Sequence, residues 1–294
     1  MSKNKKELFR GAATALITPF SDDGIDYKAL DGLIDFQLDG GISALVMAGT
    51  TGEAPTLSYR ELEKLFSFAA DKTEGKAKII AGCGGNSTER AKDIAIIAKK
   101  CGCDGILAVT PYYNKPSSLG LTRHFLELAE AGLPTILYNV PSRTGVSIDM
   151  DCYRALAKHP LVVGVKEASG NISAVCDLLS ELGDDLDVYT GNDDMTVPTM
   201  ALGGKGCISV VSNLLPLETN ELCRLCLEGR YAAASELQLA LIPIIRAMFK
   251  ETNPIPIKYA LSKIGFCQPV YRLPLCPPTE KTAQIIDLMI KSLK

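Results

Sequence analysis

Lys166 is the residue in this sequence best placed to act as a nucleophile. It ends the apolar run 162–166, and strand alternation would put Val162, Gly164 and Lys166 on one face, with Gly164 leaving room for the long side chain. If that face is a protein interior, loss of solvation lowers the pKa of the amine, which can then attack a carbonyl and form a Schiff base. The alternative is a lysine that reaches the surface or pairs with Glu167.

Four other polar residues follow apolar runs. Tyr138 lies near the end of the run 135–139, where a phenol can relay protons during imine formation or simply fill space. Thr50 and Thr51 lie between glycines, so they can hold a carboxylate or cap a helix. Arg143, in the loop after Tyr138, can clamp a carboxylate or remain a solvated charge. Taken singly, Tyr138, the threonines and Arg143 each favour the structural role.

Metal and redox chemistry are weakly supported. Cys223 and Cys226 share one face of a helical pattern and, with only two histidines in the chain, indicate buried thiols rather than a zinc site. For Asp193 and Asp194, capping of the helix after the seventh apolar run is favoured over metal binding. We therefore expect neither a metal nor a cofactor.

The elements that must position these residues alternate regularly. Eight short apolar runs are separated by helical patterns, which predicts parallel strands joined by right-handed crossovers. The predicted strands are 12–17, 44–48, 77–82, 105–109, 135–139, 161–166, 187–190 and 207–211, and the predicted helices between them are 26–39, 58–73, 87–100, 119–131, 150–158 and 172–182. This count predicts an α/β protein, a (β/α)₈ TIM barrel whose active site lies at the carboxyl ends of the strands. An open doubly wound sheet is the alternative, but the glycine-rich run 82–87 lacks the last glycine of a dinucleotide signature.

The rest of the chain is expected to form a C-terminal helical extension. Its predicted helices are 217–227, 230–249, 254–264 and 279–292. Asn253 is expected to cap the third of these helices, with Pro254 at its first position. We therefore predict a catalytic barrel over residues 1–229 and a helical domain over residues 230–294.

Composition narrows the class of protein. The chain has 294 residues and a net charge of −3, which provides no basic surface for nucleic acid and no polybasic patch for a membrane. Residues 1–10 are polar and Lys-rich, and no apolar run reaches the roughly 18 residues of a membrane span. We expect a cytoplasmic protein.

Five motifs, in order along the chain, resemble those of dihydrodipicolinate synthases, which belong to the N-acetylneuraminate lyase superfamily of class I aldolases. They are Gly-Thr-Thr-Gly-Glu at 49–53, Thr-Pro-Tyr-Tyr-Asn at 110–114, Leu-Tyr-Asn-Val-Pro-Ser-Arg-Thr-Gly at 137–145, Gly-Val-Lys-Glu-Ala at 164–168 and Asn-Pro-Ile-Pro-Ile-Lys at 253–258. The similarity covers nearly the whole chain. It implies a lyase that condenses pyruvate with L-aspartate 4-semialdehyde on the route to lysine and diaminopimelate, without a cofactor.

The resemblance also assigns roles to residues. It implies that Lys166 forms the pyruvate Schiff base, and that Tyr138, Thr51 and Tyr113 form a hydroxyl relay. Thr50, together with Thr51, would bind the pyruvate carboxylate. The remaining implied residues are Arg143, which would bind the carboxylate of aspartate semialdehyde, and Gly191 and Ile208, whose backbone carbonyls would line the pocket.

Tyr113 further implies an oligomer, because in the family this tyrosine reaches into a neighbouring subunit's site. We expect at least a homodimer, and usually a homotetramer.

Two other interpretations remain at this point. One is a related aldolase, such as N-acetylneuraminate lyase or a keto-deoxy-sugar-acid aldolase, which shares the lysine and the tyrosine. The Ser-Arg pair at 142–143 and Asn114 favour the dicarboxylate-forming enzyme. The other is a non-catalytic ligand-binding barrel, against which the lysine, phenol and hydroxyl set argues, since binding alone needs no nucleophile.

The resemblance finally predicts insensitivity to lysine. The positions that line the lysine site of inhibited relatives are matched here by Ala54, Pro55, Tyr59, Leu62, Asn86, Arg90 and Tyr112. Inhibited bacterial relatives typically have glutamate at the position of Arg90 and histidine at that of Leu62. An arginine there repels a cationic ligand, so we expect no feedback inhibition by lysine.

Overall fold

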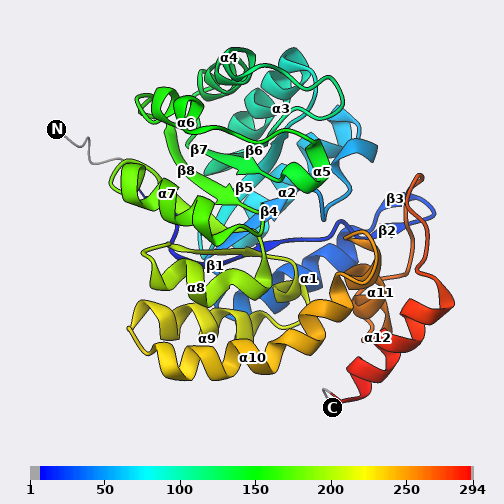
Figure 1. Ribbon diagram of the computed structural model, residues 1–294. Coiled ribbons are helices and arrows are strands. Elements are labelled where there is room, and N and C mark those ends of the chain that lie inside the picture. Colours follow the sequence, from blue (N-terminus) through cyan, green and yellow to red (C-terminus); the bar gives the residue numbers. More distant parts are fainter. Residues whose placement is uncertain (1–6, 293–294) are drawn as a thin grey trace.

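Eight parallel strands close into a barrel with helices around it (Figure 1). The computed structural model describes residues 7–292 of the chain. The barrel strands are β1 (Gly11–Ala15), β4 (Ala44–Met47), β5 (Lys78–Gly84), β6 (Gly105–Val109), β7 (Thr135–Asn139), β8 (Val162–Glu167), β9 (Asp187–Thr190) and β10 (Gly206–Ser209). β1 pairs in parallel with both β4 and β10, which closes the sheet. The predicted (β/α)₈ barrel is confirmed, and the open sheet is excluded.

The predicted helices are all present, with ends that differ by a few residues at most. They are α1 (Tyr27–Asp39), α2 (Tyr59–Thr73), α3 (Thr88–Lys100), α4 (Ser118–Ala129), α6 (Met150–Leu156), α7 (Ile172–Leu182), α9 (Pro216–Leu227), α10 (Tyr231–Met248), α11 (Ile255–Lys263) and α12 (Glu280–Ser292). The structure adds short elements that the sequence pattern did not indicate: β2 (Phe20–Ser21), β3 (Gly24–Ile25), α5 (Pro141–Thr144), α8 (Thr196–Ala201) and the 3₁₀ turns η1 (Ala54–Thr56), η2 (Asp193–Met195) and η3 (Val211–Asn213). No helix within residues 7–292 is long and apolar enough to span a membrane.

Strand alternation divides the apolar residues into two cores. One lies inside the barrel and includes Ile136 and Tyr138, and the other lies between the strands and the helices. The predicted alternation of β8 is wrong at its start, because Thr135 pairs with Val162 whereas Ile136 pairs with Gly164. This bulge puts Val163 in the inner core and Val162 in the outer one.

The C-terminal helices run along one side of the barrel, where α10 lies beside α9 and leads into α11 and α12 (Figure 1). The capping role predicted for Asn253 is wrong. α11 starts at Ile255 without a side-chain cap, and the Asn253 side chain instead donates to Thr51 Oγ1 at 2.9 Å. The domain boundary at residue 230 stays a prediction.

Candidate active site

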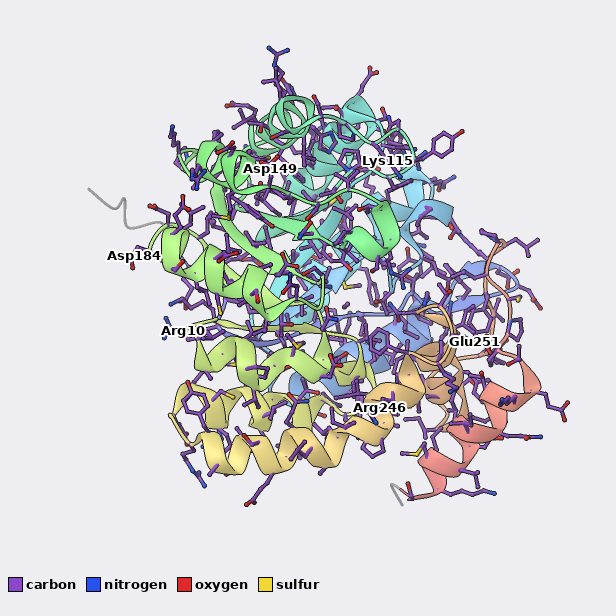
Figure 2. The ribbon with its side chains drawn as sticks, viewed as in Figure 1. Arg10, Lys115, Asp149, Asp184, Arg246 and Glu251 are labelled. Carbon is purple, nitrogen blue, oxygen red and sulfur yellow. The ribbon has the colours of Figure 1, made fainter. Side chains whose placement is uncertain are left out.

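A cavity of about 740 Å³ opens at the carboxyl ends of the barrel strands. Its lining includes six of the predicted site residues: Thr50, Thr51, Tyr138, Arg143, Lys166 and Gly191. Residues beyond the barrel complete one wall, including Arg246 near the end of α10 and Glu251 just after it (Figure 2). The strand ends thus bring together residues that lie far apart in the sequence.

Lys166 lies inside the barrel with only 4% of its surface exposed. Burial is the main cause that lowers the pKa of its amine to about 8, and the charge of Arg143 adds to the effect, whereas Asp193 and Cys207 oppose it. The amine sits 4.4 Å from the centroid of the Tyr138 ring. Glu167, the alternative partner, instead accepts hydrogen bonds from Asn139 Nδ2 and the Ser169 amide. A neutral amine is therefore accessible near neutral pH.

A different glycine from the one predicted makes room for this lysine. A Cβ at Gly191 would lie 2.7 Å from Lys166 Cε. A Cβ at Gly164 would instead meet the Asp187 carbonyl oxygen at 2.6 Å and the Tyr189 ring at 3.3 Å. The absence of a side chain at Gly164 thus leaves room for its neighbours Asp187 and Tyr189 on β9. The absence of a side chain at Gly191, just after β9, leaves room for the side chain of Lys166.

Tyr138 presents its phenol beside the amine from the end of β7. Burial raises its pKa, while Arg143 and a hydrogen bond with the Thr50 side chain lower it. The threonine in contact with the phenol is thus Thr50, whereas Thr51, the residue predicted for the relay, is bonded to Asn253. The two threonines are successive residues, but their hydroxyl groups have different partners.

Arg143 lies on the short helix α5 and has an exposed side chain at the edge of the cavity. One guanidinium nitrogen, Nη2, donates to the Asn253 carbonyl oxygen at 3.1 Å. The remaining donors of the guanidinium are free to face a ligand within the cavity. Asn253 thus contacts both the turn that carries Thr51 and the arginine.

The other predicted residues are placed differently. Gly191 lines the cavity, but Ile208 is fully buried in the inner core, and Val210 is the described residue of that segment that reaches the cavity wall. Tyr113 is 88% exposed and has a positive φ of 72°, so its side chain projects from the surface. Within one chain, Tyr113 does not line the cavity of Lys166.

Asp193 is a buried carboxylate that the sequence interpretation misplaced. The predicted capping of the helix after β9 is wrong for Asp193, because its carboxylate accepts hydrogen bonds from Ser209 Oγ and from the amides of Val210 and Val211. It therefore ties the end of β10 to η2, where both segments meet the cavity. Burial raises the pKa of this carboxyl, and its hydrogen bonds oppose that shift.

A second cavity of about 300 Å³ lies on the other side of Tyr138 and Thr50. Among its lining residues are Leu62, Asn86, Arg90 and Tyr112. The Arg90 guanidinium carbon lies 5.6 Å from the centroid of the Tyr59 ring. Arg90 is therefore part of the lining of this cavity, and its guanidinium lies within cation–π distance of Tyr59.

The cysteines and other ligating residues form no metal cluster in the described part of the chain, residues 7–292. Cys223 and Cys226 are buried on α9, as predicted, and Cys223 Sγ lies 3.6 Å from Cys207 Sγ. Burial raises the pKa of Cys226 to about 11, which keeps it in the thiol form.

A closed barrel with a buried amine at the carboxyl ends of its strands has the architecture of a barrel enzyme with a lysine nucleophile. The sequence profile of the dihydrodipicolinate synthetase family matches residues 8–293. The chain therefore belongs to the dihydrodipicolinate synthetase family, and it is a lyase.

Individual relatives agree with this assignment. The chain is 42% identical over 288 residues to 4-hydroxy-tetrahydrodipicolinate synthase of Methanocaldococcus jannaschii, covering 97% of this chain and 99% of the relative. The crystal structure of dihydrodipicolinate synthase from Aquifex aeolicus superposes with a TM-score of 0.95 at 41% identity, covering 97% and 98% of the two chains. The Acinetobacter baumannii enzyme, solved in complex with pyruvate, has a TM-score of 0.94 at 38% identity, covering 96% and 98%.

Proposed function

We propose that this lyase makes 4-hydroxy-tetrahydrodipicolinate by condensing pyruvate with L-aspartate 4-semialdehyde through a Schiff base on Lys166. The observation that carries the proposal is the buried amine of Lys166, whose pKa of about 8 leaves a reactive neutral fraction near neutral pH. The relatives' shared name and the pyruvate in the Acinetobacter baumannii complex support the choice of substrates.

In the first half-reaction, the Lys166 amine adds to the ketone carbon of pyruvate, and a proton from Tyr138 lets the hydroxyl group of the adduct leave as water, which gives a protonated imine. The methyl group then returns a proton to Tyr138 and the imine becomes an enamine, with the imine nitrogen as electron sink. Tyr138 is the proton carrier next to the amine, because Lys166 Nζ lies 4.4 Å from the centroid of the Tyr138 ring. We assign Thr50, in contact with Tyr138, to the relay position that was predicted for Thr51. The Thr50-Thr51 turn binds the pyruvate carboxylate.

In the second half-reaction, the enamine carbon attacks the aldehyde of aspartate semialdehyde, and a carbon–carbon bond forms. The amine of the adduct then attacks the imine carbon, closes the ring and displaces Lys166. Arg143, at the edge of the cavity, binds the carboxylate of the aldehyde substrate. Gly191 contributes by admitting the Lys166 side chain, as its close approach to Cε indicates.

We assign Tyr113 to the active site of a neighbouring copy of the chain, which makes the active form a homo-oligomer, either a dimer or a tetramer built from two dimers. Its 88% exposure and left-handed backbone support this assignment, because a bulky residue in that conformation needs compensating contacts. Tyr113→Phe in the oligomer should slow turnover without changing the fold.

The experiment that tests the function is incubation with pyruvate and borohydride, followed by a coupled assay with both substrates. One irreversible pyruvyl adduct per chain, located on Lys166 and absent from Lys166→Ala, is expected. An adduct on Lys205 or Lys258 would refute the mechanism. N-acetylneuraminate cleavage, run in parallel, is expected to be absent.

A further inference from the structure

The turn that carries Thr50 and Thr51 is attached to the C-terminal extension by a buried ion pair. The turn is followed by Glu53, which has a positive φ of 54° and is only 2% exposed. Its Oε1 lies 2.5 Å from Nζ of Lys258 on α11, and both side chains are completely buried. The catalytic turn and the extension, separated by about two hundred residues, thus meet through two opposite charges.

The second oxygen of Glu53 is also held from the extension. Glu53 Oε2 accepts a hydrogen bond from the Arg272 amide at 3.1 Å. The Arg272 guanidinium donates to the Thr56 carbonyl oxygen at 3.0 Å and pairs with Glu61 at 2.5 Å. Both oxygens of the carboxylate are therefore fixed in direction, and so is the segment that follows the turn.

Aromatic rings surround this ion pair. The Lys258 amine lies 4.1 Å from the centroid of Phe20 and 5.4 Å from that of Tyr271. Although burial lowers the pKa of Lys258, Glu53 opposes that shift, so the cation keeps its partner. Such an ion pair is a poor source of stability, because desolvation of both charges cancels much of their attraction. Its directional contacts are what an apolar pair of similar size would lack.

We propose that Lys258 is a positioning residue that acts through Glu53 to hold Thr50 against Tyr138. The inference rests on the proposed function, since Thr50 and Tyr138 have roles only in that reaction. The path is short: Lys258 fixes Glu53, Glu53 ends the turn, and Thr50 within the turn contacts the phenol. A displacement of about 1 Å at such a group costs on the order of a hundredfold in rate.

The test compares Lys258→Met, Glu53→Gln and the double variant with the wild type in the full-length enzyme. The single Lys258→Met leaves a buried carboxylate unpaired, whereas the double variant removes both charges and keeps an oxygen for the Arg272 amide. Lys263→Met is the matched control, because that lysine lies on the same helix with 43% of its side chain exposed.

The measurement is kcat/KM for pyruvate and for aspartate semialdehyde, each of which reports its own half-reaction. We expect the value for pyruvate to fall about a hundredfold in Lys258→Met and to stay low in the double variant, with the value for aspartate semialdehyde reduced less than tenfold. The ratio of the two values does not depend on how much enzyme is folded. Partial unfolding therefore cannot produce this result.

An unchanged ratio in the double variant would overturn the inference, because Lys258 would then serve only to neutralise Glu53. If these variants do not fold, Glu53→Asp keeps the charge but shortens the side chain by one methylene, which withdraws the carboxylate from Lys258. The same change of ratio is then expected at smaller size. A wild-type enzyme that forms no pyruvate adduct would instead refute the proposed function, which keeps the two failures distinct.

Discussion

The pH dependence of imine formation tests the central feature of the site, the buried amine of Lys166. With a pKa of about 8, roughly 9% of the amine is neutral at pH 7, compared with about 0.03% for the ordinary value of 10.5. The fold thus raises the reactive fraction by up to about 300-fold, which corresponds to roughly 3 kcal/mol. Because the neutral form is the nucleophile, the rate should rise about ninefold from pH 6 to pH 7 and level off above pH 8.

The assay mixes enzyme with excess pyruvate at pH values from about 6 to 10.5, traps the imine with borohydride at successive times, and counts adducts by intact mass. Peptide mapping locates the adduct, and Lys166→Ala serves as the blank. A midpoint near 10.5, the ordinary value for lysine, would refute the argument from burial even with the adduct on Lys166. In Arg143→Ala the midpoint should move upward, because the guanidinium contributes to lowering the pKa.

Four further outcomes follow from the same contacts. Arg143→Ala should lower kcat/KM for aspartate semialdehyde about a hundredfold, which corresponds to a loss of roughly 2–3 kcal/mol of transition-state stabilisation, and should change the rate of imine trapping far less. Equal losses in kcat/KM and in the trapping rate would show that Arg143 has a structural role. Tyr138→Phe should slow trapping of the pyruvate adduct by at least about a hundredfold, and an unchanged trapping rate would remove the phenol from the relay. Lys166→Met should raise the free energy of unfolding by up to about 3 kcal/mol below pH 8, because the native state there carries an unfavourable buried charge. This gain should vanish as the pH rises from 8 to 10.5, and urea titrations that give the same gain at pH 7 and pH 10.5 would contradict the prediction. Free lysine should not inhibit the enzyme, because Arg90 repels a cation, by roughly 4 kcal/mol for like charges near 4 Å, and Leu62 offers the cation no hydrogen-bond acceptor. Half-inhibition at a lysine concentration at or below about 1 mM would refute this prediction.

The barrel could be predicted from the sequence because each of its strands is marked by the residues of the strand itself. The run 135–139 matches β7 residue for residue, since buried parallel strands need continuous apolar residues and the turns after them do not. β8 shows the limit of the same reasoning. Its start depends on pairing with β7, where Thr135 opposes Val162 and Ile136 opposes Gly164, and no alternation within one strand reveals that shift.

The site residues likewise divide into those that their own segment reveals and those that depend on distant partners. Lys166 could be located from its own strand, because a lysine side chain at the carboxyl end of a barrel strand lies either in the barrel interior or at its surface. Asn253 could not, because its partner Thr51 lies 202 residues away and its own neighbourhood resembles a helix start. The choice between Thr50 and Thr51 likewise depends on the orientation of one turn, and residues of the C-terminal extension contact this turn at Thr51 and at Glu53.

The junction between Glu53 and Lys258 has a consequence for the order of events during protein synthesis. The last barrel strand is complete at Ser209, but Lys258 is added roughly fifty residues later, which takes about 2 to 10 seconds at ordinary elongation rates. During that interval a nascent chain can hold a closed barrel, with its nucleophile in place, while the turn that serves it has no anchor. A chain that ends between these two points would therefore lack the ion pair between Glu53 and Lys258, and we expect the Thr50 turn in such a product to have no fixed position against Tyr138.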